Sequence, residues 1–319
     1  MNYRLFGKID LKVSEIGLGT WAFASRAYGS VAETDAIKTI HAALDAGFTL
    51  FDTAPLYGDA ECDGISEEIL GRGLGTKRND VFISTKFGRN STQRAVPNFC
   101  GQRAKESVEE SLKRLNTDHI DVLFFHSPFS SEDIHDDVWQ ALSDLKQQGK
   151  VRLIGHSISK FQDTQQMART WVVERKIDVI QVVYSLMNRE SAALIHDLGE
   201  KGIGIFARES LANGFLSGMV TRDTQFENNN LNKRYSREEI ADRVAYIENL
   251  SFLLRDRVKN MPQAALRWVL DNPCVSLVLS GAKNPTELSD AIAASALPSF
   301  TQEEHQRIKE LHTRDFQAA

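Results

Sequence analysis

Short apolar runs rich in β-branched and aromatic residues recur eight times along the chain, and amphipathic helical patterns separate most of them. The runs cover residues 13–19, 48–53, 81–86, 120–126, 151–157, 178–184, 203–208 and 275–280. The helical patterns cover residues 33–46, 66–74, 104–115, 135–148, 161–171, 190–200 and 236–272, the last divided near Pro262. Because each helix returns the chain to the same edge of a sheet, successive strands should run parallel. The alternation predicts an α/β protein built as a closed (β/α)8 TIM barrel.

The sequence predicts one domain over residues 1–319. A barrel of roughly 250 residues counts as a single domain, and no linker, low-complexity segment or shift in composition marks a boundary. The stretch Leu5–Val13 carries turn signals and predicts an N-terminal hairpin that closes the barrel bottom. The irregular stretch 210–235 is long enough to be a functional lid or a disordered loop.

Charge and patterning exclude several classes of partner. The 38 basic residues are outnumbered by 43 acidic ones, so no basic surface favours nucleic acid. No apolar run approaches the roughly 18 residues of a membrane span, the N-terminus lacks the features of a secretory signal, and three cysteines are too few for a disulfide framework. We therefore expect a cytoplasmic protein without nucleic-acid or membrane partners. The eight histidines show no close His/Cys/acid spacing, so no metal site is predicted.

Polar residues follow the apolar runs at the points where the predicted strands end. In a barrel of this kind the active site lies at the C-terminal ends of the strands. Any one such residue is typical of an ordinary strand-end salt bridge or hydrogen bond, but five that converge on one end of a barrel indicate a site. The residues are Asp52, Lys86, His126, Ser157 and Arg208, with Tyr57 in the loop after Asp52.

These side chains suit proton transfer to a carbonyl group. Tyr57 has an ordinary pKa of about 10 and is a proton donor near neutral pH, and we expect a neighbouring Lys86 to lower that pKa. Asp52 would keep Lys86 charged, and His126 would orient the carbonyl that Tyr57 protonates. The same groups suit general base catalysis on an alcohol. Because none of them can supply two electrons, a cofactor is required.

At these residues the sequence resembles the aldo-keto reductase superfamily over nearly its whole length. The family's motifs are matched, in order, by residues 47–58, 84–88, 124–128, 150–155, 181–184 with 188–189, and 281–283. The family's catalytic tetrad maps onto Asp52, Tyr57, Lys86 and His126 without a substitution. The resemblance implies a single barrel that binds NADPH or NADH in an extended form across the strand ends, with no Rossmann domain.

The resemblance also implies which residues contact the cofactor. They are Thr20, Trp21, Asp52, Ser157, Gln181, Arg208, Ser210, Leu211, Gly214, Leu216, Ser217, Arg234, Gly281, Lys283, Glu287 and Asp290. The chain departs from the family's pattern at several of these sites. Ile158 follows Ser157 where the family usually has asparagine, and Arg208 stands where many members stack an aromatic ring on the nicotinamide.

The adenosine segment bears on the choice between NADP and NAD. Glu287 replaces the glutamine or arginine that is common in the family, and its carboxylate would repel a 2′-phosphate. Lys283, Lys233 and Arg234 could compensate through charge-assisted hydrogen bonds. We expect NADP (NADPH) as the cofactor, with NAD as the alternative.

The expected substrate is a small-molecule carbonyl compound or a sugar, in a pocket lined by aromatic residues. The candidates are Trp21, Phe23, Tyr28, Phe87, Phe99 and Phe129. We predict an NAD(P)-dependent oxidoreductase that reduces an aldehyde or ketone to an alcohol. The alternatives are a sugar or polyol dehydrogenase that runs oxidatively, and a nucleotide-binding regulatory protein with slow turnover, as the potassium-channel β subunits of this superfamily suggest. The sequence is compatible with a monomer and with a ring of subunits.

Overall fold

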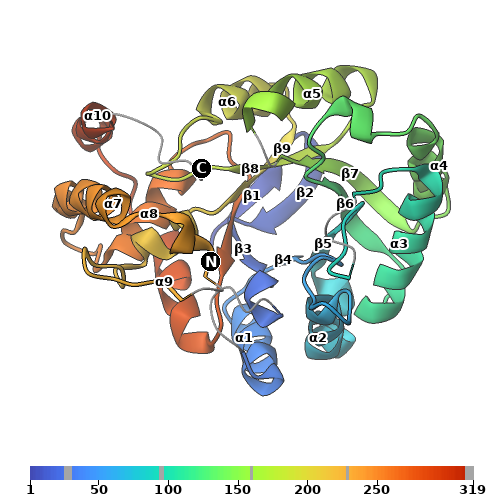
Figure 1. Ribbon diagram of the computed structural model, residues 1–319, viewed down its shortest axis with the longest axis horizontal. Coiled ribbons are helices and arrows are strands. Elements are labelled where there is room, and N and C mark those ends of the chain that lie inside the picture. The colour runs from blue at the N-terminus through green and yellow to red at the C-terminus, as the bar shows by residue number, and fades with distance from the viewer. Residues whose placement is uncertain (25–30, 93–96, 159–160, 228–229, 313–319) are drawn as a thin grey trace.

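Eight parallel strands close into a barrel, as the alternating pattern predicts (Figure 1). The computed structural model describes residues 1–24, 31–92, 97–158, 161–227 and 230–312, and Tyr28 lies outside them. Around the barrel the strand order is β10-β3-β4-β5-β6-β7-β8-β9, and every neighbouring pair is parallel. The strands are β3 (Ile16–Gly19), β4 (Leu50–Asp52), β5 (Phe82–Phe87), β6 (Ile120–His126), β7 (Val151–Ser157), β8 (Val179–Val183), β9 (Gly204–Arg208) and β10 (Leu277–Gly281).

Helices form a ring outside the barrel (Figure 1). They are α1 (Glu33–Asp45), α2 (Ile65–Leu74), α3 (Gly101–Leu115), α4 (Asp137–Gln147), α5 (Phe161–Glu174), α6 (Ala192–Glu200), α7 (Arg237–Asn249), α8 (Met261–Leu270), α9 (Pro285–Ser295) and α10 (Gln302–Leu311). The sequence pattern did not indicate α9 or α10. The buried face of α9 is made mainly of alanines around Leu288, and α10 buries only Ile308. Such narrow apolar faces give a weak periodic signal.

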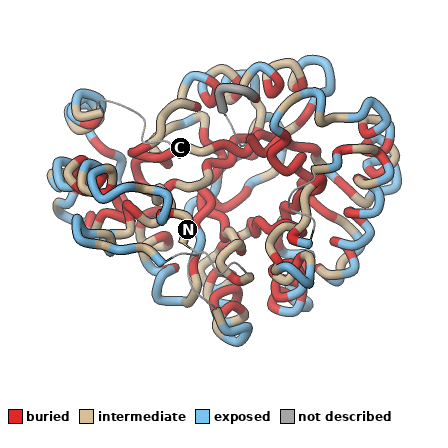
Figure 2. Tube along the Cα trace, viewed as in Figure 1, coloured by how far each residue is buried: buried red, intermediate tan, exposed pale blue. Residues whose placement is uncertain are grey.

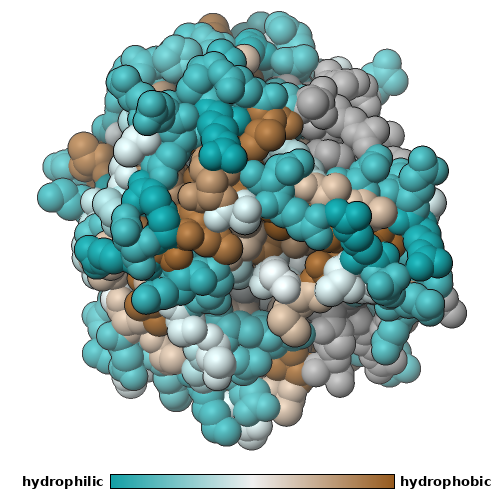
Figure 3. Space-filling model, turned by 90° about the vertical axis from the view of Figure 1, so that its left-hand side faces the viewer, coloured by the Kyte–Doolittle hydropathy of each residue, from teal (hydrophilic) through white to brown (hydrophobic). Residues whose placement is uncertain are grey.

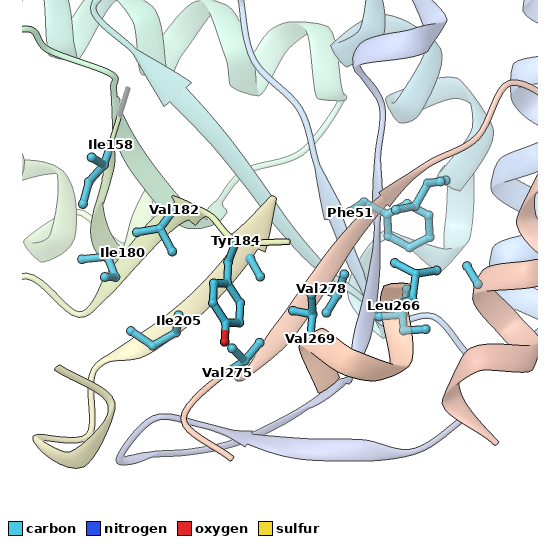
Figure 4. Close-up of a cluster of buried hydrophobic side chains, with 14 of the residues drawn as sticks. Phe51, Ile158, Ile180, Val182, Tyr184, Ile205, Leu266, Val269, Val275 and Val278 are labelled. Atoms are coloured by element: carbon cyan, nitrogen blue, oxygen red, sulfur yellow. The ribbon is translucent and has the colours of Figure 1, made fainter. Parts of the chain in front are cut away.

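Side chains alternate between the barrel interior and the layer beneath the helices, because successive strand residues point to opposite faces. Leu50, Phe124 and Phe206 belong to the interior cluster. Their neighbours Phe51 and Phe125 belong to the cluster between the strands and the helices, part of which is drawn in Figure 4. Figure 2 shows that burial is concentrated in these strands and in the inner sides of the helices.

The predicted hairpin is present as β1 (Tyr3–Phe6) and β2 (Ile9–Ser14), which pair antiparallel. Phe6 lies in the interior cluster with its ring 5.3 Å from that of Phe206. The backbone N–H of Lys8 donates to the carbonyl of Gly202, which precedes β9. The hairpin therefore closes the barrel at the N-terminal ends of the strands, and the opposite end is left for polar side chains.

The irregular stretch after β9 is built from short turns in its described residues. Two 3-10 turns lie there, η5 (Ala212–Ser217) and η6 (Leu231–Arg234). The side-chain amide of Asn232 donates to the carbonyl of Asn213 at 2.9 Å, and the rings of Phe215 and Tyr235 are 5.6 Å apart. These contacts join the two turns into one packed unit beside the strand ends.

The outer surface on the side of α7 and α10 is mainly hydrophilic (Figure 3). Among the residues that the structure describes, no helix combines the length and the apolar character that crossing a membrane requires.

Candidate active site

The polar residues at the C-terminal ends of the strands point into the barrel, as do the apolar residues that fill it. Asp52 lies two residues after the interior residue Leu50, and His126 lies two residues after Phe124. Arg208 has the same relation to Phe206. Because strand side chains repeat with a period of two, the pattern that fills the barrel also directs these polar groups inward. The barrel interior is therefore apolar toward the N-terminal ends of the strands and polar at their C-terminal ends.

Lys86 joins Asp52 to Tyr57 by direct hydrogen bonds. The Nζ of Lys86 donates to Oδ2 of Asp52 at 2.7 Å, to the carbonyl of Thr53 at 2.9 Å and to the hydroxyl of Tyr57 at 3.1 Å. These are three acceptors for the three N–H bonds of an ammonium group. Lys86 is thus held in one orientation, with one N–H directed at the tyrosine oxygen.

The charge of Lys86 is maintained in a fully buried position. Burial by itself lowers the pKa of the ammonium group, but the charge of Asp52 and the contact with Tyr57 outweigh it, so the pKa lies above its ordinary value. Asp52 therefore keeps a cation beside the tyrosine hydroxyl.

The pKa of Tyr57 is raised overall, although Lys86 by itself lowers it. Burial of the phenol is the largest cause, and the attraction of Lys86 offsets only part of it. Asp52 also raises the pKa, since its negative charge opposes a second one nearby. In the free protein Tyr57 is therefore a proton donor across the neutral pH range.

His126 faces Tyr57 and is neutral. The two rings meet edge to face, with centroids 6.1 Å apart. Burial first, and then the positive charges of Lys86, Arg89 and Arg208, hold the pKa of His126 well below its usual range. Its Nδ1 atom is buried without a hydrogen-bond partner among the described residues. A neutral imidazole keeps one N–H, which can be donated to a substrate oxygen.

A chain of polar side chains continues from Asp52 across the barrel. Its Oδ1 accepts from the hydroxyl of Ser84 at 2.7 Å and from the amide of Gln181 at 3.0 Å, and the hydroxyl of Ser157 donates to Oε1 of Gln181 at 2.9 Å. Thr20 donates its hydroxyl to the carbonyl of Asp52. Ser84 was not singled out from the sequence, although it lies two residues before Lys86 and so on the same face of β5.

The resemblance implies nucleotide contacts at Arg208 and in the turn after it. The guanidinium of Arg208 donates to the carbonyl of Ile158 at 2.7 Å and pairs with Glu209. Its Nε is buried and has no hydrogen-bond partner in the part of the chain that the structure describes. Gly214 has a φ of +94°, and a Cβ added there would meet no atom of the described residues within 4 Å. The turn thus has an open backbone next to an incompletely bonded cation, which suits an anionic ligand.

The other residues that were predicted to contact the cofactor here make contacts within this turn or with neighbouring segments. Ser210 donates its hydroxyl to the carbonyl of Tyr184, and Ser217 donates to the carbonyl of Gly214. Leu216 is fully buried, and its N–H donates to the carbonyl of Leu211. Arg234, in η6, lies with its guanidinium carbon 4.9 Å from the ring centroid of Tyr235.

Three residues after β10 that were predicted to contact the adenosine bind one another or residues at the start of α8. Glu287 accepts from the N–H of Lys283 at 3.0 Å, and its Oε1 lies 3.7 Å from the Nζ of the same lysine. Gly281 is the last residue of β10 and is exposed. The carboxylate of Asp290 accepts from the side-chain amides of Asn260 and Gln263. Asp290 therefore connects α9 to α8.

Three of the aromatic residues predicted for the substrate pocket, Phe23, Phe87 and Phe99, lie in the core. Phe87 is fully buried against Phe99 and Phe125, and Phe23 is also buried in the layer beneath the helices. Phe87 points away from the barrel interior because successive strand residues point to opposite faces, and its neighbour Lys86 points into the barrel. Trp21 lies at the site, with its ring 6.4 Å from that of Tyr57.

Arg89 is a cation near the site that the sequence did not single out. Its guanidinium carbon lies 4.2 Å from the ring centroid of Phe129, which is 43% exposed. The Nε and one Nη of Arg89 are buried without a hydrogen-bond partner among the described residues. Its charge helps to lower the pKa of His126, so Arg89 adds to the positive potential at this end of the barrel.

Comparison with known proteins identifies relatives over almost the whole chain. A sequence model described as the Aldo/keto reductase family matches residues 15–313. The aldo-keto reductase YhdN of Bacillus subtilis (strain 168) is 33% identical over 296 residues, which cover 90% of this chain and 87% of that protein. The L-galactose dehydrogenase of Arabidopsis thaliana is 31% identical over 305 residues, with 91% and 87% covered.

Solved structures of the same family share the architecture. The glycerol dehydrogenase AKR11B4 from Gluconobacter oxydans superimposes with a TM-score of 0.81 at 29% sequence identity. The alignment covers 98% of this chain and 96% of that one.

Proposed function

The chain belongs to the aldo/keto reductase family, and from this premise we propose that it reduces small-molecule aldehydes or ketones to alcohols with Tyr57 as the proton donor. The protein is an NAD(P)H-dependent oxidoreductase. The observation that carries the proposal is the contact chain from Asp52 through Lys86 to the hydroxyl of Tyr57, with His126 facing the same ring.

Tyr57 donates its proton to the carbonyl oxygen as that oxygen gains negative charge. The phenolate that remains faces the ammonium of Lys86 at hydrogen-bond distance. Because Asp52 already orients this ammonium, little rearrangement accompanies the transfer. His126 donates an N–H to the same oxygen and keeps it directed at the tyrosine. General acid catalysis of this kind contributes about 10²- to 10⁴-fold to the rate.

The residues at the strand ends fit a nicotinamide dinucleotide. Ser157 and Gln181 would hold the carboxamide, the turn around Gly214 would contact the pyrophosphate, and the Lys283 region would contact the adenosine. Two observations on the described residues support this placement: the Nε of Arg208 has no hydrogen-bond partner among them, and none of them lies over the backbone at Gly214. When bound, the reduced cofactor supplies the two electrons and one hydrogen that no side chain of the site can provide.

A panel of aldehydes, ketones, sugars and polyols, assayed in both directions with NADPH/NADP and NADH/NAD, tests the proposed function. We expect reduction of simple aldehydes to be the faster direction at neutral pH, because Tyr57 is protonated there. The oxidative alternative is favoured by two relatives, one named an L-galactose dehydrogenase and the other a glycerol dehydrogenase. Faster oxidation of sugars or polyols would support it. Tight cofactor binding without turnover on the whole panel would instead indicate a regulatory protein.

The rate of reduction should depend weakly on pH across the neutral range. Tyr57 must be protonated to act as the acid, and its pKa is raised above 10, so the active form is lost only at strongly alkaline pH. His126 stays neutral until the pH is well below 6.5. We expect kcat/KM for reduction to change less than about threefold between about pH 6.5 and pH 9, whereas oxidation, which needs the phenolate, rises with pH. A tenfold fall in reduction over that interval would contradict these roles.

Replacing Glu287 with glutamine should increase the preference for NADPH. The substitution removes a negative charge beside the predicted 2′-phosphate position and releases Lys283 from its carboxylate partner. Glutamine is also acceptable at the third position of a helix, so the start of α9 should be retained. For a partly exposed charge we expect NADPH to bind about two- to fivefold more tightly, with NADPH already preferred in the wild type.

Quenching of tryptophan fluorescence by each reduced cofactor measures this change, and Glu303→Gln at the start of α10 is a matched surface control. Tighter binding of NADH by the wild type, or an unchanged dissociation constant for NADPH in Glu287→Gln, would show that Glu287 does not face the ribose.

A further inference from the structure

A cluster of three potential metal ligands lies at the end of the barrel opposite to Tyr57. His196 and Glu200 are on α6, which leads into β9, and Cys274 lies in the segment before β10. Both β9 and β10 begin at the N-terminal end of the barrel, whereas the active site is at the C-terminal end. The cluster is therefore separate from the site described above.

The donor atoms are close to the spacing that a tetrahedral metal ion requires. The Sγ of Cys274 lies 4.0 Å from Nδ1 of His196 and 3.7 Å from Oε1 of Glu200, and all three donors are within 4.8 Å of one another. Zinc bound at ordinary bond lengths to sulfur, nitrogen and oxygen places these donors about 3.4–3.6 Å apart. Small rotations of His196 and Glu200, which are exposed, bring them to this spacing.

We propose that His196, Glu200 and Cys274 form a surface binding site for a divalent transition-metal ion of the zinc class. Residues four apart on a helix share one face, so α6 presents the imidazole and the carboxylate side by side. A thiolate, an imidazole and a carboxylate are the ligands that zinc takes in proteins, and water completes the fourth position. The sequence did not predict this site because 74 residues separate Glu200 from Cys274.

The backbone holds Cys274 against the helix. A Cβ added at Gly199 would lie 2.5 Å from Cβ of Cys274, so α6 and the segment before β10 approach each other closely only because position 199 is glycine. The N–H of Cys274 also donates to the side chain of Asn272 at 3.0 Å. All three donors therefore lie on two elements that are already in contact, and binding needs no rearrangement of the backbone.

Binding replaces the S–H bond of Cys274 with a bond from sulfur to the metal ion, and the proton passes to solvent. In the free protein, burial and the charge of Glu200 raise the pKa of this thiol. The cysteine is consequently not poised as a nucleophile, since a reactive cysteine has a lowered pKa. A bound ion would connect α6 to the segment before β10 and stabilise this end of the barrel.

Titration of the whole purified protein with Co²⁺ tests the site, because cobalt bound to a thiolate absorbs in the near ultraviolet. We expect one equivalent to bind with this absorption and Zn²⁺ to displace it. Cys274→Ser should abolish the band, and His196→Ala and Glu200→Gln should each weaken binding by at least about tenfold. Cys62→Ser removes a different exposed cysteine and should leave the titration unchanged.

A second variant moves the ligands apart without removing any of them. Gly199→Ala should weaken Co²⁺ binding, since the added methyl group displaces Cys274, and circular dichroism reports whether the barrel is retained. Zn²⁺ should raise the melting temperature of the wild type but not that of Cys274→Ser. Cobalt absorption that persists in Cys274→Ser, or that disappears in Cys62→Ser, would overturn the proposal. Neither readout depends on catalytic activity.

Discussion

Replacing Tyr57 with phenylalanine is expected to lower the rate of carbonyl reduction by about 10²- to 10⁴-fold. The substitution removes only the hydroxyl that Lys86 contacts, so the reacting oxygen loses its proton donor while the ring and its packing remain. The measurement is kcat at saturating cofactor with the best aldehyde of the substrate panel. Cofactor affinity, measured separately by fluorescence, should change little.

Tyr184→Phe is the matched control for this experiment. It also deletes a buried phenolic hydroxyl, but the Tyr184 side chain packs against Trp268 and its hydroxyl points toward Val275 (Figure 4). This variant should keep the wild-type rate and lose only some stability. If Tyr57→Phe retains activity within a factor of about 10 of the wild type, well short of the general-acid contribution, Tyr57 is not the proton donor.

Replacing Asp52 with asparagine should destabilise the folded protein by about 3–5 kcal/mol. Lys86 is fully buried, and the substitution leaves its ammonium without a counter-charge. Replacing both partners, in Asp52→Asn/Lys86→Met, removes the buried charge altogether and should restore much of the loss. Both variants should be inactive in reduction, because each disrupts the contact to Tyr57.

The free energy of unfolding, from denaturation by urea, separates these effects. Asp80→Asn is the control, since it breaks an ion pair with Lys77 in which both side chains are more than 60% exposed; it should cost less than about 1 kcal/mol. A double variant as unstable as Asp52→Asn alone would mean that the cost comes from lost packing rather than from an unpaired ammonium.

Part of the candidate site was predictable because strand positions and strand ends are local properties of the sequence. Asp52, Lys86 and His126 each follow an apolar run, and a closed barrel brings the ends of all its strands to one rim. The same reasoning did not identify Ser84 or Arg89. Ser84 would have followed from counting two residues back from Lys86, whereas the position of Arg89 over Phe129 depends on how two loops pack.

The sequence by itself determined the eight-stranded parallel barrel, its closing hairpin and the polar residues at the strand ends, because these depend on periodicity within short segments. Only the tertiary structure decided the direction of the pKa shift at Tyr57, where burial outweighs the nearby lysine. It also decided that Phe87 lies in the core and that His196 and Glu200 meet Cys274. The physical reason is the same in each case. Burial and contacts between distant segments are sums over neighbours from many elements, and no local pattern in the chain specifies those neighbours.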